Sequence, residues 1–241
     1  MQTGLGGAKI TRMRDFLYST RPEWSEFHQR LVLVLWLGLL AGGVGLAIWA
    51  SIDDHFPADI AVGHWLQDNS PGGQSVIDFV RDVGSSIAAV VTILVVSAGL
   101  FVSGRRRLAM VAVALLGGIA FQAILKELVD RPRTAVLFLE QRAGFDSPSF
   151  PSGHTMSSIL IASLLLYVVC RIRAPLPLRF PLAIWGVGIG FLSPWIAVSG
   201  GVHWPSDALG AAVWAWAGLL PLGVLMEAAR RRDGLDTTKE P

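Results

Sequence analysis

Six runs of apolar residues constrain the fold of this chain more than any other feature. They cover approximately residues 31–51, 83–104, 108–125, 154–170, 181–198 and 207–226. An α-helix needs about 20 apolar residues to cross the hydrocarbon core of a bilayer. Only 16% of the residues are charged, whereas a soluble domain has roughly 25%. The sequence therefore predicts an all-α membrane protein in which six transmembrane helices form a bundle.

The segments at the two ends of the chain are polar and basic. A signal peptide has an apolar core of roughly 7–15 residues, and the first apolar run here is longer than that. We therefore expect a cytoplasmic N-terminal segment at residues 1–30, a six-span domain at 31–228 and a cytoplasmic tail at 229–241. Cys170 is the one cysteine, which excludes an internal disulfide and a metal cluster held by thiolates.

The connection between the first two apolar runs, residues 52–82, contains two short amphipathic pieces. These pieces cover residues 60–66 and 76–80, and a Ser-Pro-Gly-Gly break at 70–73 separates them. Two interpretations stay open: short helices that lie along the membrane surface, where Trp65 would be favoured, and an ordinary extramembrane loop.

The positions of the basic residues predict the topology. Cytoplasmic loops of membrane proteins carry an excess of Lys and Arg. With both termini in the cytoplasm and six crossings, fifteen of the twenty Lys and Arg residues are cytoplasmic. Four of the other five belong to one outer loop, and they are Lys126, Arg131, Arg133 and Arg142. A basic cluster on the outer face of a cell membrane indicates an anion-binding site there.

The segment Phe150-Pro151-Ser152-Gly153-His154 stands where this loop meets the fourth apolar run. The first turn of a helix offers free N–H groups and the positive end of the helix dipole, which suit a phosphate. Ser152 can cap such a helix, and Gly153 allows a ligand to approach the backbone. The alternative interpretation is a plain helix start with a capping serine.

A second motif, His203-Trp204-Pro205-Ser206-Asp207, opens the last apolar run. Asp207 follows His203 by four residues, so its carboxylate can accept a hydrogen bond from one ring nitrogen. That bond would fix the tautomer and leave the other nitrogen as a nucleophile. The alternative is that both side chains only cap the helix.

Lys126 and Arg133, seven residues apart, are candidates for binding phosphate oxygens and for neutralising charge in a transition state. The alternative is that these side chains extend to lipid head groups at the membrane surface. The motifs contain no dense cluster of carboxylates or thiolates, so no metal ligand is predicted.

Lys-x6-Arg, Pro-Ser-Gly-His and His-x3-Asp, in this order on one membrane face, resemble the type 2 phosphatidic acid phosphatase family, which includes the vanadium haloperoxidases. The resemblance implies metal-independent hydrolysis of a phosphate ester or anhydride through a phosphohistidine. It implies that His203 is the nucleophile, Asp207 its orienting partner and His154 the general acid. Lys126, Arg133, Ser152 and Gly153 would hold the phosphate.

The resemblance also implies the partners. The substrate would be a lipid phosphate or a (poly)prenyl diphosphate in the bilayer, with no cofactor and no nucleic acid. The enzyme would be a multi-pass protein of the inner or plasma membrane with its site on the outer face. The oligomeric state is not predicted.

The sequence departs from the family pattern at two positions. Thr134 follows Arg133 where the family has proline. Ala197, six residues before His203, stands where the family has an arginine that holds phosphate. Either Arg131 or Arg142 replaces that cation, or the activity is weakened or altered.

Two alternatives to a hydrolase therefore stay open. One is a lipid phosphotransferase, which would pass the phosphate to another lipid instead of water. The other is a degenerate lipid-binding or transport protein without catalysis, which Ala197 favours and the presence of His154, His203 and Asp207 opposes. The hydropathy excludes a soluble haloperoxidase.

Overall fold

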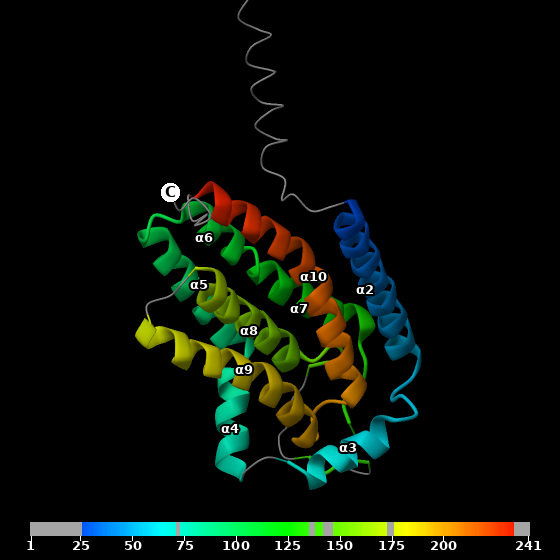
Figure 1. Cartoon of the computed structure of the whole chain (residues 1–241). Coiled ribbons are helices and arrows are strands. Elements are labelled where there is room, and N and C mark those ends of the chain that lie inside the picture. Colours follow the sequence, from blue (N-terminus) through cyan, green and yellow to red (C-terminus); the bar gives the residue numbers. More distant parts are fainter. Residues whose placement is uncertain (1–25, 71–72, 135–137, 142–146, 173–175, 234–241) are drawn as a thin grey trace, which may run out of the picture.

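The computed structural model describes residues 26–70, 73–134, 138–141, 147–172 and 176–233, and these residues contain helices and no strand (Figure 1). The helices are, in order, α2 (Glu26–Ile52), α3 (Asp59–Asp68), α4 (Gln74–Val83), α5 (Ser86–Val102), α6 (Arg106–Val113), α7 (Leu116–Val129), α8 (Gly153–Arg171), α9 (Leu176–Ser199) and α10 (Pro205–Arg232).

Five helical stretches are long and apolar enough to cross a membrane. They are α2, the stretch Arg106–Val129 that contains α6 and α7, and helices α8, α9 and α10. A sixth span arises when α4 and α5, which meet at a bend of 51°, are counted together. The prediction of an all-α membrane bundle is confirmed. The expected domain boundaries at residues 31 and 228 fall inside α2 and α10.

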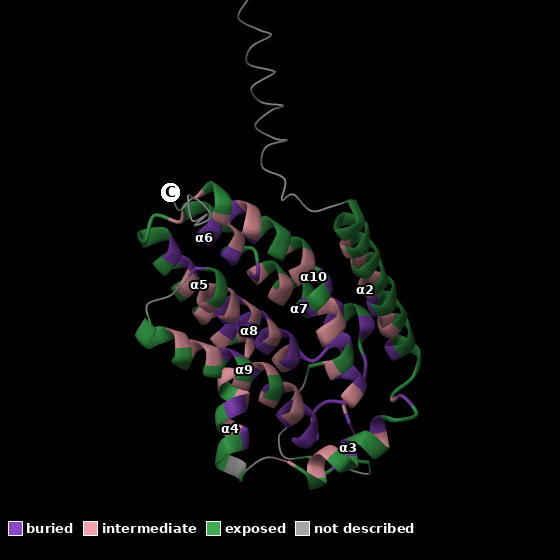
Figure 2. Cartoon of the chain, in the orientation of Figure 1, coloured by how far each residue is buried: buried purple, intermediate pink, exposed green. Residues whose placement is uncertain are grey.

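Helix α8 lies in the middle of the bundle, and Figure 2 shows it as mostly buried. Met156, Leu160 and Leu164 recur every four residues, so they share one face, which packs against α5, α6 and α10. Ile161 and Leu165 face α4, α5 and α9. The partner helices contribute many alanines to these contacts, as expected in a bilayer, where close approach of helices replaces the hydrophobic effect.

Large apolar side chains remain exposed on the outside of the bundle. On α9, Phe180, Ile184 and Phe191 are each more than 70% exposed, and most of α2 is exposed as well (Figure 2). In a membrane these apolar surfaces contact lipid tails, so they need not be buried against other parts of the protein.

Helices α3 and α4 and the chain around the starts of α8 and α10 lie at one end of the bundle, opposite the arginines at 105–107 and 230–232 (Figure 1). The two amphipathic pieces predicted in the first outer loop lie within α3 and α4, so both are helices. Their position along the membrane surface stays a prediction. At this same end, α7 stops at Asp130, whose φ of 49° ends the helix.

Candidate active site

Three segments that are far apart in the chain meet at this end of the bundle. They are the end of α7 with the loop after it, the start of α8, and the turn between α9 and α10. A cavity of about 300 Å³ lies between them. Five of the residues that the sequence predicted for the site line it, and they are Lys126, Arg133, Gly153, His154 and His203.

Ser152 fixes the start of α8. Its hydroxyl oxygen accepts a hydrogen bond from the N–H of Thr155 at 3.4 Å, so Ser152 is the helix cap. Its own N–H donates to the carbonyl oxygen of Asp207 at 3.1 Å, which joins the starts of α8 and α10. A Cβ at Gly153 would lie 3.3 Å from the side chain of Gln122, so the glycine keeps α8 close to α7. The first turn of α8 therefore presents its N–H groups beside the cavity.

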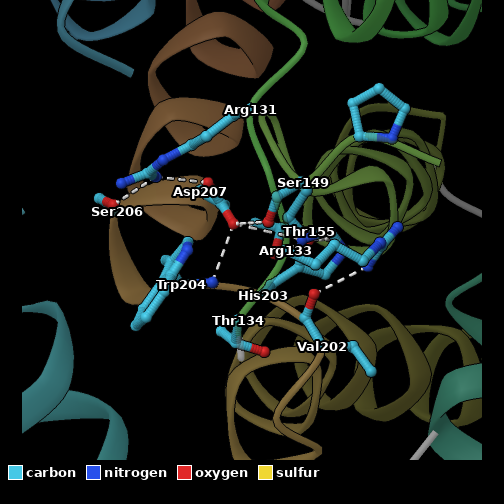
Figure 3. Close-up of polar contacts among 12 residues, drawn as sticks. Arg131, Arg133, Thr134, Ser149, Thr155, Val202, His203, Trp204, Ser206 and Asp207 are labelled. Carbon is cyan, nitrogen blue, oxygen red and sulfur yellow. Dashed lines mark hydrogen bonds and ion pairs between the residues drawn. The ribbon is translucent and has the colours of Figure 1, made fainter. Parts of the chain in front are cut away.

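Asp207 is fully buried and accepts several hydrogen bonds (Figure 3). Its Oδ2 accepts from the N–H of Trp204 at 2.8 Å and from the hydroxyl of Ser149. Its Oδ1 accepts from Nη1 of Arg131 at 2.6 Å. The bond from Trp204 shows that Asp207 does cap α10, as the alternative interpretation expects, and the same carboxylate also faces His203.

His203 stands between that carboxylate and the cavity. Its Nδ1 lies 3.4 Å from Oδ2 of Asp207, and its Nε2 lies 3.4 Å from Nη1 of Arg133. The side chain is buried, and burial lowers the pKa of His203 to about 4, although Asp207 opposes this shift. The ring is therefore neutral at neutral pH and presents Nε2 to the cavity.

The turn before His203 depends on a glycine. Gly201 has a φ of 68°, and a Cβ there would lie 2.0 Å from the carbonyl oxygen of Glu140. The hydroxyl of Thr134 donates to the carbonyl oxygen of Gly201. These contacts hold the turn against the loop that carries Arg133, and so set the position of His203 relative to the cations.

Lys126 and Arg133 point toward the site and not toward lipid. Nζ of Lys126 donates to the carbonyl oxygen of Pro148 at 2.6 Å, and the residue is 9% exposed. Arg133 donates from Nε to the carbonyl oxygen of Ser147 at 2.7 Å and from Nη1 to that of Val202 at 2.8 Å. Partial burial lowers the pKa of Arg133 from its ordinary value. The carbonyl oxygens that accept from Lys126 and Arg133 do not neutralise them, so the positive charge still attracts an anion in the cavity.

Arg131, which the sequence offers together with Arg142 as the replacement phosphate ligand, does not line this cavity. Its side chain lies on the far side of Asp207 and is fully buried. Nη2 pairs with Asp59 at 3.2 Å, Nη1 donates to the hydroxyl of Ser206 at 2.8 Å, and the guanidinium stacks on the ring of Phe56. Two carboxylates already neutralise this cation, and it lies behind Asp207, outside the lining of the cavity.

Arg142 and Ala197 are the other two positions that concern the phosphate-binding arginine missing from this sequence. Arg142 lies outside the described residues. Ala197 is buried in the last turns of α9 and lines a second, smaller cleft together with His154.

Asp59 and Ser149 are site residues that the sequence did not reveal. Asp59 opens α3 and accepts hydrogen bonds from the N–H of Phe56 and from the N–H and hydroxyl of Ser206. In the sequence it is an ordinary acidic residue in a first helical turn. No local pattern links it to Arg131, 72 residues later.

In the described parts of the chain, no group of three or more His, Cys, Asp or Glu side chains forms that could hold a metal ion.

Comparisons with known proteins identify the family and the fold. The model of the PAP2 superfamily matches residues 107–231. Among solved structures, the fold is similar to the crystal structure of the first transmembrane PAP2 type phosphatidylglycerolphosphate phosphatase from Bacillus subtilis. The TM-score is 0.59 at 18% identity, over 85% of this chain and 98% of that chain. Comparison with curated proteins gives no match. The family match covers more than half of the 241 residues and includes all three motifs, and the chain is therefore a multi-pass membrane protein that belongs to the PAP2 superfamily.

Proposed function

We propose that this protein is a lipid phosphatase that forms a phosphohistidine at His203. One observation carries the proposal: His203 has one ring nitrogen next to a buried carboxylate and the other at a cavity that also contains Lys126 and Arg133. An oriented neutral imidazole beside two cations is suited to attack on a phosphorus atom, because the cations reduce the repulsion between the phosphate and the nucleophile's lone pair.

In the first step, Nε2 of His203 attacks the phosphorus and forms a P–N bond. The bond from phosphorus to the leaving oxygen breaks, and that oxygen keeps the electron pair. His154 donates the proton that the leaving oxygen takes up. Asp207 stabilises the positive charge of the phosphorylated ring, while Lys126, Arg133 and the first-turn N–H groups of α8 bind the phosphate oxygens.

In the second step, a water molecule attacks the phosphorus from the cavity. The P–N bond breaks and its electron pair returns to Nε2 of His203. His154, which lost its proton in the first step, accepts the proton of the water. The products are inorganic phosphate and the enzyme in its starting state.

The surroundings of the cavity support a lipid as the substrate. Ala123 on α7 lines the cavity, and its neighbours Ile124 and Leu128 are 60% and 75% exposed. These side chains would contact acyl or prenyl chains in a bilayer. A substrate whose tail stays in the membrane can therefore place its phosphate in the cavity without leaving the lipid.

Phosphate release from defined lipids tests the proposal. Purified full-length protein in mixed micelles is given phosphatidate, phosphatidylglycerol phosphate and a prenyl diphosphate, with and without EDTA. We expect phosphate release that survives EDTA and is lost in His203→Gln. His64→Gln is the matched control, because His64 is exposed on α3 and does not line the cavity. A phosphorylated lipid product in place of free phosphate would instead identify a phosphotransferase, and binding without turnover a lipid-binding protein.

The charge distribution supports an outer, periplasmic position for the site, in the inner or plasma membrane with both termini in the cytoplasm. Single cysteines at Asn69 and at Gly104, placed in a Cys170→Ser background, test this orientation. Both positions are exposed, and they belong to opposite ends of the bundle. We expect an impermeant thiol reagent to label position 69 and not position 104 in intact cells. The opposite pattern would put the site in the cytoplasm.

A further inference from the structure

A second, smaller cleft lies beside the main cavity, and His154 lines both. Its volume is about 20 Å³, which is room for about one water molecule. Most of its wall is apolar or backbone. The charged group in the wall is Arg81 of α4, and Ala197 and Gly200 of the α9 end also line it.

Helix α4 is firmly seated, so the position of Arg81 is defined. Ile77 and Val80 are buried against α8 and α9. At the end of α4, a Cβ on Gly84 would lie 2.4 Å from the hydroxyl oxygen of Ser193. This close approach of α4 to α9 fixes the helix one turn beyond Arg81 and aims the arginine at the cleft.

The present partners of Arg81 hold it weakly. Its guanidinium pairs with Asp78 at 3.0 Å and with Asp82 at 3.8 Å, both on its own helix. All three side chains are at least 31% exposed, and exposed pairs of this kind contribute little to stability. A phosphate can accept two parallel hydrogen bonds from a guanidinium, so it can replace Asp78 as the partner of Arg81 at the mouth of the cleft.

The opposite wall of the cleft carries small residues of the α9 end. Ala197 carries only a methyl group and Gly200 only a hydrogen, and both line the same cleft as Arg81. Any longer side chain at Ala197 would enter the space that lies between α9 and Arg81. The cation at this wall therefore comes from α4 and not from α9.

We propose that Arg81 binds the leaving phosphate of a diphosphate substrate and so makes the site selective for diphosphates over monophosphates. This inference rests on the proposed function. When His203 attacks the terminal phosphorus, the bridging P–O bond breaks and the bridging oxygen departs on a lipid monophosphate. That oxygen takes its proton from His154, and the remaining negative charge of the leaving phosphate lies next to Arg81. A monophosphate releases a neutral lipid alcohol, which offers Arg81 no charge.

The test compares two substrates with the same prenyl chain, a diphosphate and a monophosphate, in Arg81→Gln. A hydrogen bond to a charged group corresponds to a change of about 10- to 100-fold, so we expect kcat/KM for the diphosphate to fall by that factor. For the monophosphate we expect a change of about threefold or less. Arg81→Lys should keep part of the preference, and Arg107→Gln, at the other end of the bundle, is the matched control for loss of a positive charge. An equal loss for both substrates, or no loss for either, would overturn the assignment.

A binding measurement separates this inference from the proposed function. A non-hydrolysable prenyl methylenediphosphonate and the matching prenyl phosphonate are titrated into the protein by calorimetry, which needs no turnover. We expect Arg81→Gln to weaken binding of the diphosphonate about 10-fold or more and to leave the phosphonate unchanged. Adding Ala197→Arg to Arg81→Gln should restore diphosphonate binding, because it returns a cation to the same cleft. Unchanged diphosphonate binding in Arg81→Gln would refute the role of Arg81, whereas absent phosphate release by the unmodified protein would refute only the proposed function.

Discussion

Basic side chains lie on both sides of the His203–Asp207 pair, but they differ in burial and in hydrogen-bond partners. Behind Asp207, Arg131 is buried and paired with both Asp207 and Asp59. In front of His203, Lys126 and Arg133 face a cavity and donate to neutral carbonyl oxygens. Arg131 and Arg133 are only two residues apart, and the His203–Asp207 pair lies between their guanidinium groups (Figure 3).

This difference shows how one loop can contribute both a buried ion pair behind Asp207 and a cation that lines the cavity. A buried cation that two carboxylates neutralise has no charge left for a ligand, but it fixes the carboxylates in place. A carbonyl oxygen does not neutralise a cation, so Lys126 and Arg133 still attract an anion. Under the proposed function, the rear region would hold His203 in place and the front region would determine which substrate reacts with it.

Removing His203, which lies between the two regions, should have the largest effect. His203→Ala takes away the nucleophile, and we expect turnover to fall by about 10⁴-fold or more for every substrate. His154→Ala removes only the acid, which is worth about 10²–10⁴-fold. An aryl phosphate, whose leaving group needs little protonation, should therefore partly restore kcat/KM, which reports formation of the phosphoenzyme, in His154→Ala and not in His203→Ala. Equal restoration in both variants would contradict the two roles.

Removing Arg131 tests the rear region. Arg131→Met leaves Asp59 and Asp207 buried with no cation between them, and breaking a buried pair costs about 3–5 kcal/mol. We expect a large drop in Tm in detergent, and a partial recovery when Asp59→Asn is added. If Arg131 were a phosphate ligand, its loss would raise KM and leave Tm nearly unchanged.

Removing Arg133 tests the front region. Loss of one donor to the developing charge typically costs about 10²–10³-fold in rate. We expect Arg133→Gln to lower kcat/KM by that factor with a smaller drop in Tm than Arg131→Met, because its partners are carbonyl oxygens near the surface. A variant that loses stability and keeps its rate would reverse the distinction between the two arginines.

The pH dependence is the smallest expected effect. The pKa of His203 is lowered to about 4, chiefly by burial, so the nucleophile stays neutral down to low pH. Protonation of His203 should therefore cause no loss of kcat/KM, corrected for ionisation of the substrate, above about pH 5.5, and should lower kcat/KM as the pH approaches about 4. His154, the proposed acid, must carry a proton, so any loss of rate at higher pH reports His154. The free energy of unfolding should fall from pH 6.5 toward 4, because in this window the unfolded chain binds a proton at His203 and the folded chain does not. His203→Gln should lack that contribution. An acid limb near pH 6.5 would show that the ring is not buried as described.

The sequence predicted most of the fold because the spans are long apolar runs, which need no tertiary information. It also predicted the members of the His203–Asp207 pair, since four residues along one helix start bring the two side chains together. The sequence could not show that Arg131 pairs with buried carboxylates whereas Arg133 lines the cavity. That difference depends on Asp59, which reaches Arg131 only after α3 packs across the end of the bundle. Arg81 was missed for the same reason, because α4 and α8 become neighbours only in the folded chain.

A covalent phosphate on His203 is the central claim, and trapping it is the most direct test. In His154→Ala, an aryl phosphate needs no acid to form the intermediate, whereas hydrolysis of the intermediate still lacks its base, so the phosphoenzyme should accumulate. Rapid quenching at alkaline pH should give a burst of the aryl alcohol that matches the amount of enzyme. Mass spectrometry should then find an acid-labile phosphate on the peptide that contains His203. A burst without phosphate on that peptide, or a phosphate on another residue, would contradict the account.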